Sequence, residues 1–149
     1  MISAWDKSLD ILSRAEHSAL DLKNKLLKKG YDREDVEDTI RRLCEAGYLS
    51  DERYARAYIR RNLASKDVRL ICRELGQKGI RLTPEDPLVS EVLQEEEFSE
   101  EEALESLVYR KLRGKDSSDE KERRRLIVYL QRRGFSYRAI QDAVEHLSV

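Results

Sequence analysis

Side chains able to do acid–base and nucleophilic chemistry stand next to one another at Glu16, His17 and Ser18. Such a set could activate a serine hydroxyl if its three groups faced one another. Adjacent positions do not face one another on a helix, so we expect Ser18 to cap a helix and His17 to pack or hydrogen-bond at the turn. The sequence also lacks a glycine-rich phosphate loop and a Gly-x-Ser-x-Gly segment. We therefore expect no catalytic residues and a protein that is not an enzyme.

The residues that most often bind transition metals are few and scattered. The sequence has two cysteines, Cys44 and Cys72, and two histidines, His17 and His146. None of them forms the closely spaced pairs typical of zinc sites. Both cysteines adjoin apolar positions of predicted helices, so we expect them to be small buried hydrophobic residues. We predict no metal site and no cofactor.

Charge is segregated along the chain, although the formal net charge is only −1. Residues 1–52 carry 9 basic and 12 acidic side chains, and residues 53–81 carry 9 and 2. Residues 82–105 carry no basic and 10 acidic side chains, and residues 106–149 carry 11 and 6. Segregation of this kind creates local electric fields that can steer a charged partner.

Basic residues recur at helical spacing in the positive segments. They form a first stripe at Arg53, Arg56 and Arg60, a second at Lys66, Arg69 and Arg73, and a last group at Arg124, Arg125, Arg132 and Arg133. We interpret the two stripes as a surface for phosphates or for an acidic partner. For the last group, a merely solvated face is an equal alternative. Tyr54 and Tyr58 could stack on bases, but their spacing favours packing in the core.

The acidic segment from Glu85 to Glu105 has three possible interpretations. It could be a solvated face, it could fold against the basic stripes, or it could repel DNA from one side of the molecule. Residues 95–97, three consecutive glutamates, are the predicted hinge between the second and third parts of the chain.

Apolar spacing and capping residues predict helices and no strands, hence an all-α fold. Serine, threonine or aspartate begins most of the segments, often with an acidic residue three positions later. For one of them, Thr83 is the predicted cap and Pro84 the first helical residue. The nine predicted helices span about 6–15, 18–29, 33–46, 51–63, 66–77, 84–94, 100–113, 118–133 and 137–148.

The chain also repeats itself. When the sequence is aligned on Gly30 and Gly134, apolar residues coincide before and after each glycine, and a third, weaker copy aligns on Gly79. This pattern predicts a helix that ends at a left-handed glycine and is followed by a second helix. We expect an elongated tandem array of three three-helix repeats at 1–48, 49–95 and 96–149.

Four segments resemble the RecX family of regulators of the bacterial recombinase RecA. They are EHSALDLKNKLLKKGY (16–31), GYLSDERYARAYIRRNL (47–63), ICRELGQKGI (71–80) and RRRLIVYLQRRGFSYRAIQDAV (123–144). The chain departs from the family pattern at residues 63–67, where the family usually carries a basic turn with glycine, and at Pro84 and Pro87.

The resemblance implies a partner and an activity. Members of the family bind RecA filaments on single-stranded DNA and lower ATP hydrolysis and strand exchange, within DNA recombination, DNA repair and the SOS response. The residues themselves leave two alternatives open: a helical DNA-binding module that acts without RecA, and a helical scaffold for an unrelated protein. We expect a cytoplasmic monomer, because no segment is apolar enough to span a membrane and the apolar positions are used within the helix stack.

Overall fold

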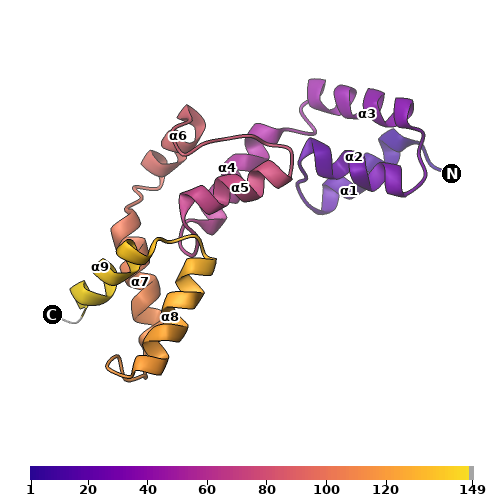
Figure 1. Ribbon diagram of the computed structural model, residues 1–149. Coiled ribbons are helices and arrows are strands. Elements are labelled where there is room, and N and C mark those ends of the chain that lie inside the picture. Colours follow the sequence, from indigo (N-terminus) through magenta and orange to yellow (C-terminus); the bar gives the residue numbers. More distant parts are fainter. Residues whose placement is uncertain (148–149) are drawn as a thin grey trace. The chain divides into compact units, whose positions relative to one another are not determined.

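The computed structural model describes residues 1–147, which form nine α-helices and no strand (Figure 1). The predicted all-α class is therefore confirmed. The helices are α1 (Ala4–Arg14), α2 (Ala19–Lys28), α3 (Arg33–Glu45), α4 (Asp51–Asn62), α5 (Val68–Gln77), α6 (Pro87–Glu95), α7 (Glu100–Leu112), α8 (Glu120–Arg132) and α9 (Tyr137–Leu147). In the described part of the chain, no helix has both the length and the apolar character needed to cross a membrane.

Side-chain caps fix where most of these helices begin. The hydroxyls of Ser18, Ser50, Ser99 and Ser136 each accept a hydrogen bond from the backbone N–H three residues later, as predicted. Three predicted starts are wrong by two or three residues. Ser3 rather than Asp6 caps α1, Asp119 rather than Ser117 caps α8, and α5 follows Asp67 rather than Ser65. In each case a neighbouring serine or aspartate supplies the acceptor instead.

The start of α6 differs from the prediction for a definite steric reason. The helix begins at Pro87, with Asp86 as its N-cap residue, and not at Pro84. A start at Pro84 would place Pro87 beyond the tolerated first position, where the proline ring lacks the N–H that the helix needs. The Asp86 carboxylate instead accepts hydrogen bonds from the backbone N–H and the hydroxyl of Thr83, at 2.5 and 3.2 Å.

Left-handed residues end the second helix of every predicted repeat, as the aligned glycines suggested. Gly30, Gly79 and Gly134 have φ angles of 97°, 82° and 91°. After each of them, the N–H of the next residue donates to the carbonyl four residues before the glycine, at 2.9 to 3.2 Å. This hydrogen bond is the signature of a Schellman motif. Each of the three glycines therefore lies in a turn that follows the second helix of a predicted repeat.

The same turn also joins successive repeats, which the glycine alignment did not reveal. Gly47 follows α3 with a φ of 81°, and the N–H of Tyr48 donates to Leu43 at 3.0 Å. Glu97 follows α6 with a φ of 49°, and the N–H of Phe98 donates to Leu93 at 2.9 Å. The three glutamates at 95–97 therefore end α6 and form a turn.

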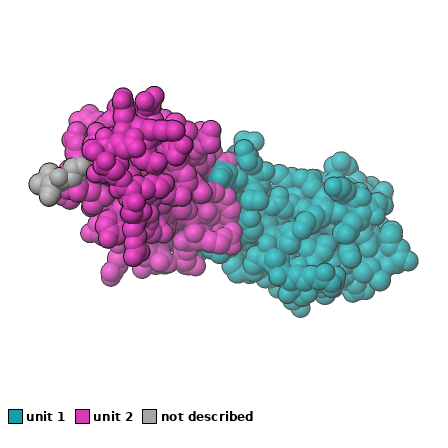
Figure 2. Space-filling model, turned by 90° about the horizontal axis from the view of Figure 1, so that it is seen from below, with its two compact units in different colours: residues 1–57, 74–82 teal, residues 58–73, 83–149 magenta. Residues whose placement is uncertain are grey.

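The chain divides into two compact units, coloured separately in Figure 2. Unit 1 comprises residues 1–57 and 74–82, and unit 2 comprises residues 58–73 and 83–149. The division passes through α4 and α5, so the middle predicted repeat contributes residues to both units. The three-repeat boundaries stay a prediction.

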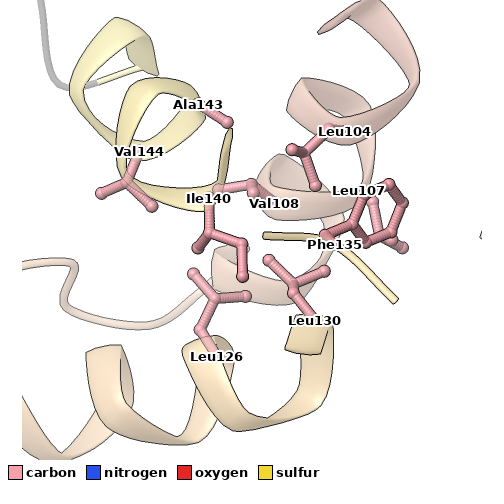
Figure 3. Packing of buried hydrophobic residues seen from close by; sticks show 9 residues of the cluster. All are labelled: Leu104, Leu107, Val108, Leu126, Leu130, Phe135, Ile140, Ala143 and Val144. Atoms are coloured by element: carbon pink, nitrogen blue, oxygen red, sulfur yellow. The ribbon is translucent and has the colours of Figure 1, made fainter. Parts of the chain in front are cut away.

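Each unit has its own cluster of buried apolar side chains. In unit 1 the cluster consists of Leu22, Leu26, Val36, Leu43 and Leu49. In unit 2, side chains from α7, α8 and α9 converge with Phe135 (Figure 3). The cluster consists of Leu104, Leu107, Val108, Leu126, Leu130, Phe135, Ile140, Ala143 and Val144. Most positions that coincide in the sequence repeat are therefore core positions.

One of the two cysteines lies outside the core, contrary to the prediction. Cys72 is buried, whereas Cys44 is exposed. The buried face of α3 runs along Val36, Thr39 and Leu43, and Cys44 falls beyond its edge. Partial burial and the neighbouring carboxylates raise the pKa of the Cys44 thiol. This shift makes the thiolate rarer and the group less nucleophilic.

Candidate functional site

His17 lies at the turn between α1 and α2, as expected, and it also orients a lysine. Its Nδ1 is 2.8 Å from the carbonyl oxygen of Ala15, and its Nε2 is 2.7 Å from the Lys25 ammonium. A carbonyl only accepts, so Nδ1 carries the proton and Nε2 accepts from Lys25. The imidazole is thereby assigned as neutral.

The first residue of the first basic stripe, Arg53, is held by four hydrogen bonds within unit 1. Its Nε and Nη2 donate to the two Glu16 carboxylate oxygens at 2.8 and 3.3 Å. Its guanidinium also donates to the carbonyl oxygens of Gly47 and Tyr48, both at 3.2 Å. A planar guanidinium suits such multiple contacts. The Arg53 side chain therefore ties the turn before α2 to the turn before α4.

The other two arginines of this stripe also have carboxylate partners. Arg56 pairs with Glu52 at 3.1 Å, one helical turn earlier. Arg60 pairs with Glu95 at 3.0 Å and with Glu96 at 3.3 Å. Of the three interpretations of the acidic segment, pairing with a basic stripe is thus observed at Arg60. The Arg56 side chain is half-buried, whereas that of Arg60 is exposed. Exposed ion pairs such as those of Arg60 contribute only about 0 to 1 kcal/mol each, so a competing anion can replace them.

In the second stripe, some side chains have a partner among the described residues and others do not. Arg69 pairs with the buried Asp67 at 3.0 Å, and Lys66 is half-buried and already has a partner within the chain. Arg73 is exposed and forms no ion pair with any residue from 1 to 147. Among the three predicted binding residues of this stripe, only Arg73 presents an unpaired guanidinium.

The last basic group lies on α8 and at its end. Arg124 is 4.0 Å from Glu120, and Arg125 pairs with Glu122 at 3.3 Å. Arg132 is exposed, and no carboxylate pairs with it in the described residues. Arg133 is half-buried, with its guanidinium 5.2 Å from the centre of the Tyr129 ring. Arg133 thus mainly packs against Tyr129. Arg132 is the exposed cation of the group that has no carboxylate partner among residues 1–147.

Aromatic side chains predicted to pack in the core are only partly buried. Tyr54 and Tyr58 are half-buried, with Lys78 and Arg61 beside their rings at 5.9 and 5.5 Å from the centroids. Trp5 lies edge-on to Tyr48, with the two ring centroids 6.0 Å apart. The guanidinium of Arg42 covers its ring at 4.6 Å.

Acidic residues at two helix starts form a repeated contact that sequence reasoning missed. In unit 1, Asp51 at the start of α4 accepts a hydrogen bond from the N–H of Ala19, the first residue of α2, at 2.8 Å. In unit 2, the Glu100 carboxyl at the start of α7 lies near the carboxyl of Asp67, which precedes α5. In both units, an acidic residue at the start of the first helix of one predicted repeat thus lies at the start of the second helix of the preceding repeat. Only the acidic residue type in the first turn signals this contact.

The pair in unit 2 brings two carboxyl groups together. The hydrogen bond with Asp67, then burial and the charge of Asp67, raise the pKa of Glu100, while Arg69 opposes the shift. A carboxyl whose pKa is raised on folding adds stability below its unfolded pKa of about 4.3 and loses that contribution as the pH rises through the folded value. At neutral pH, Glu100 therefore weakens the fold.

We predict that Glu100→Gln raises the free energy of unfolding at pH 7, because the amide removes the charge that burial and the neighbouring Asp67 oppose, and its N–H can donate to the Asp67 carboxylate. One net hydrogen bond corresponds to about 1 kcal/mol. Urea unfolding from pH 4 to pH 8 measures this effect, and the gain should shrink as the pH falls. The control Glu101→Gln makes the same charge change one residue away. An equal gain in both variants would contradict the role of the carboxyl pair.

Two large hollows of opposite charge lie in different units. In unit 2, the lining of a hollow of about 550 Å³ includes four carboxylates, Glu100, Glu101, Glu105 and Asp142, and two basic side chains, Arg138 and His146. In unit 1, a hollow of about 680 Å³ between α1 and α2 is lined by five lysine and arginine side chains, and Asp10 is its only carboxylate. Within residues 1–147, no group of three His, Cys, Asp or Glu side chains is arranged to hold a metal ion.

Comparison with known proteins matches nearly the whole chain. Family models described as the first and the third three-helix domain of RecX match residues 4–43 and 99–144. The regulatory protein RecX of Vibrio vulnificus is 33% identical over 97% of this chain and 92% of its own. That of Syntrophotalea carbinolica is 34% identical over 89% and 88%. The crystal structure of RecX from Lactobacillus salivarius, 19% identical with a TM-score of 0.71, shares the fold over 97% of this chain and 94% of its own.

Proposed function

Because the chain belongs to the RecX family of regulatory proteins, we propose that it regulates the RecA recombinase by binding RecA filaments on single-stranded DNA. Bound there, it lowers ATP hydrolysis and strand exchange. The observation that carries this proposal is the 33% identity to a regulatory protein RecX over 97% of the chain. A match of that extent includes residues of both compact units and of all nine helices.

A repeated fold suits a polymeric partner. A filament presents similar surfaces at regular intervals, and successive three-helix modules can each meet one of them. Every additional contact then forms within the same complex and gains effective concentration. Left-handed residues follow the second or third helix of a predicted repeat at Gly30, Gly47, Gly79, Glu97 and Gly134, and these turns build the repetition.

Cations in the middle and last parts of the chain are the proposed contact surface. Arg73 and Arg132 are exposed and form no ion pair within residues 1–147, so they are available to a partner. Arg60 must exchange its glutamates for the phosphates or carboxylates of the filament, which its exposed ion pairs permit. Arg56 is half-buried, but its partner Glu52 is exposed and can be exchanged in the same way. Arg53 contributes to the fold through its four contacts, so it is left intact in the test.

The test is the single-stranded-DNA-dependent ATP hydrolysis of RecA, followed while the protein is added below equimolar amounts. We expect inhibition by the wild-type protein. The double variant Arg56→Glu/Arg60→Glu should need about 5- to 30-fold more protein for the same effect, since two contacts of roughly 1 kcal/mol are reversed. The variant Glu95→Gln/Glu96→Gln, which frees Arg60, should need less protein than the wild type.

The matched control is Arg33→Glu/Arg41→Glu, which makes the same charge change on α3, outside both stripes. It should inhibit as the wild type does. No inhibition by the wild-type protein at any ratio would overturn the proposed function. Equal loss in both double variants would overturn only the assignment of the surface. Binding to bare DNA without any effect on RecA would favour the alternative, a helical DNA-binding module.

A further inference from the structure

The hollow between α1 and α2 has a composition that the fold alone does not require. Lys7 and Arg14 line it from α1, and Lys25, Lys28 and Lys29 line it from α2 and its end. Asp10 lies 3.9 Å from Lys7 and 3.5 Å from Arg14, so the only carboxylate is shared by the two cations of α1. On the α2 side, none of the three ammonium groups pairs with a carboxylate from residues 1–147.

This arrangement costs stability in the free protein. Lys25 is three residues from Lys28 and four from Lys29, and like charges at these spacings repel by about 0.2 to 0.5 kcal/mol per pair. A lysine in the last turn of a helix interacts favourably with the helix dipole, and this interaction accounts for a cation at the end of α2. It does not account for the two further cations that α1 turns towards the same space.

One cation of the hollow, Lys25, is held in place by a hydrogen bond. Lys25 donates to Nε2 of His17, and the Nδ1 side of the same ring is fixed on the carbonyl of Ala15. The neutral imidazole therefore holds the ammonium without neutralising it, which a carboxylate partner would do. A volume of about 680 Å³ lies within the range of sites that bind small ligands or segments of a larger one.

We propose that this hollow is a binding site for the backbone phosphates of nucleic acid, with Lys25, Lys28 and Lys29 as its principal contacts. Ammonium groups around a shallow space suit phosphates, which need charge but no single fixed geometry. The site lies in the first three-helix part and is separate from the basic stripes of the middle part. It requires no recombinase, so its test does not depend on the proposed function.

The experiment is fluorescence anisotropy of a labelled single-stranded oligonucleotide titrated with the full chain, at several salt concentrations. The variant is Lys28→Ala/Lys29→Ala. Each phosphate contact contributes about 0.7 to the slope of log K against log salt for single strands, so two lost contacts should flatten the slope by about 1.4. The same relation predicts a loss of affinity of about tenfold or more at low salt.

The matched control, Arg33→Ala/Arg41→Ala, removes the same net charge from α3 in the same unit, and its slope should equal that of the wild type. An equal change in both variants would overturn the proposal, because net charge alone would explain it. Absence of oligonucleotide binding by the wild-type protein would also overturn it. Poly-glutamate is the competitor. If it displaces the oligonucleotide at equal charge concentration, the site accepts protein carboxylates and the assignment to phosphate fails.

Discussion

Gly134→Ala is expected to lower the free energy of unfolding by about 2 to 5 kcal/mol. Gly134 has a φ of 91°, a conformation that costs a residue with a Cβ atom about 1 to 2 kcal/mol. The added Cβ would also lie 2.7 Å from the Cβ of Leu70 and 3.2 Å from that of Asp67. The end of α8 and the start of α5 would have to separate, and such overpacking costs about 1 to 3 kcal/mol. Urea unfolding followed by circular dichroism measures the sum.

Gly30→Ala is the matched control for this effect. Gly30 has nearly the same φ, 97°, and occupies the corresponding turn, but no atom lies within 4 Å of its added Cβ. Alanine restricts the unfolded chain equally in both variants, so that contribution cancels in the comparison. We expect a loss of only about 1 to 2 kcal/mol for Gly30→Ala. Equal losses of unfolding free energy at the two positions would show that the contact between the added Cβ and Leu70 does not contribute to the loss.

Leu130→Ala is expected to destabilise unit 2 by about 2 to 5 kcal/mol. Leu130 is completely buried at the centre of the cluster formed by α7, α8 and α9. Its truncation removes apolar contacts and leaves a cavity that the neighbouring helices fill only partly. The control Val128→Ala lies on the same helix, but its side chain is 46% exposed, and its effect should stay within about 0.5 kcal/mol.

A second readout of Leu130→Ala reports on the coupling between the units. Trp5 is the only tryptophan of the chain and belongs to unit 1, whereas circular dichroism follows the helices of both units. In a repeat protein, stability is a sum of local terms and of terms between neighbours. We therefore expect a larger shift of the transition by circular dichroism than by Trp5 fluorescence. Coincident shifts would show that the described chain unfolds as one cooperative unit.

Much of the fold could be predicted because local signals agree with one another. Serine caps, helical spacing and a glycine at the end of a helix all act within a few residues, and they locate every helix except α6 to within two residues at each end. The prediction failed where two local signals competed. Thr83 and Pro84 resemble a helix start, but the second proline moves the start of α6 to Pro87. The predicted buried face of α3 extended one residue beyond the observed one, and this error placed Cys44 in the core.

The candidate site was less predictable, because charge neutralisation depends on residues far apart in the sequence. Helical spacing placed Arg53 and Arg60 in one stripe, but their glutamate partners are 37 and 35 residues away. The basic hollow was missed for the opposite reason. Residues 1–52 carry more acidic than basic side chains, and averaging over this segment concealed the lysines gathered between α1 and α2.

The contact between Asp51 and Ala19 has a consequence for how the protein is made. The first amide of α2 finds its acceptor 32 residues further along the chain, at the start of the next repeat. A ribosome releases the N-terminal part first, at about 5 to 20 residues per second. The nascent α2 therefore waits a few seconds for that partner. The start of α2 is capped only once the start of α4 has been translated, which couples the order of folding to the order of synthesis.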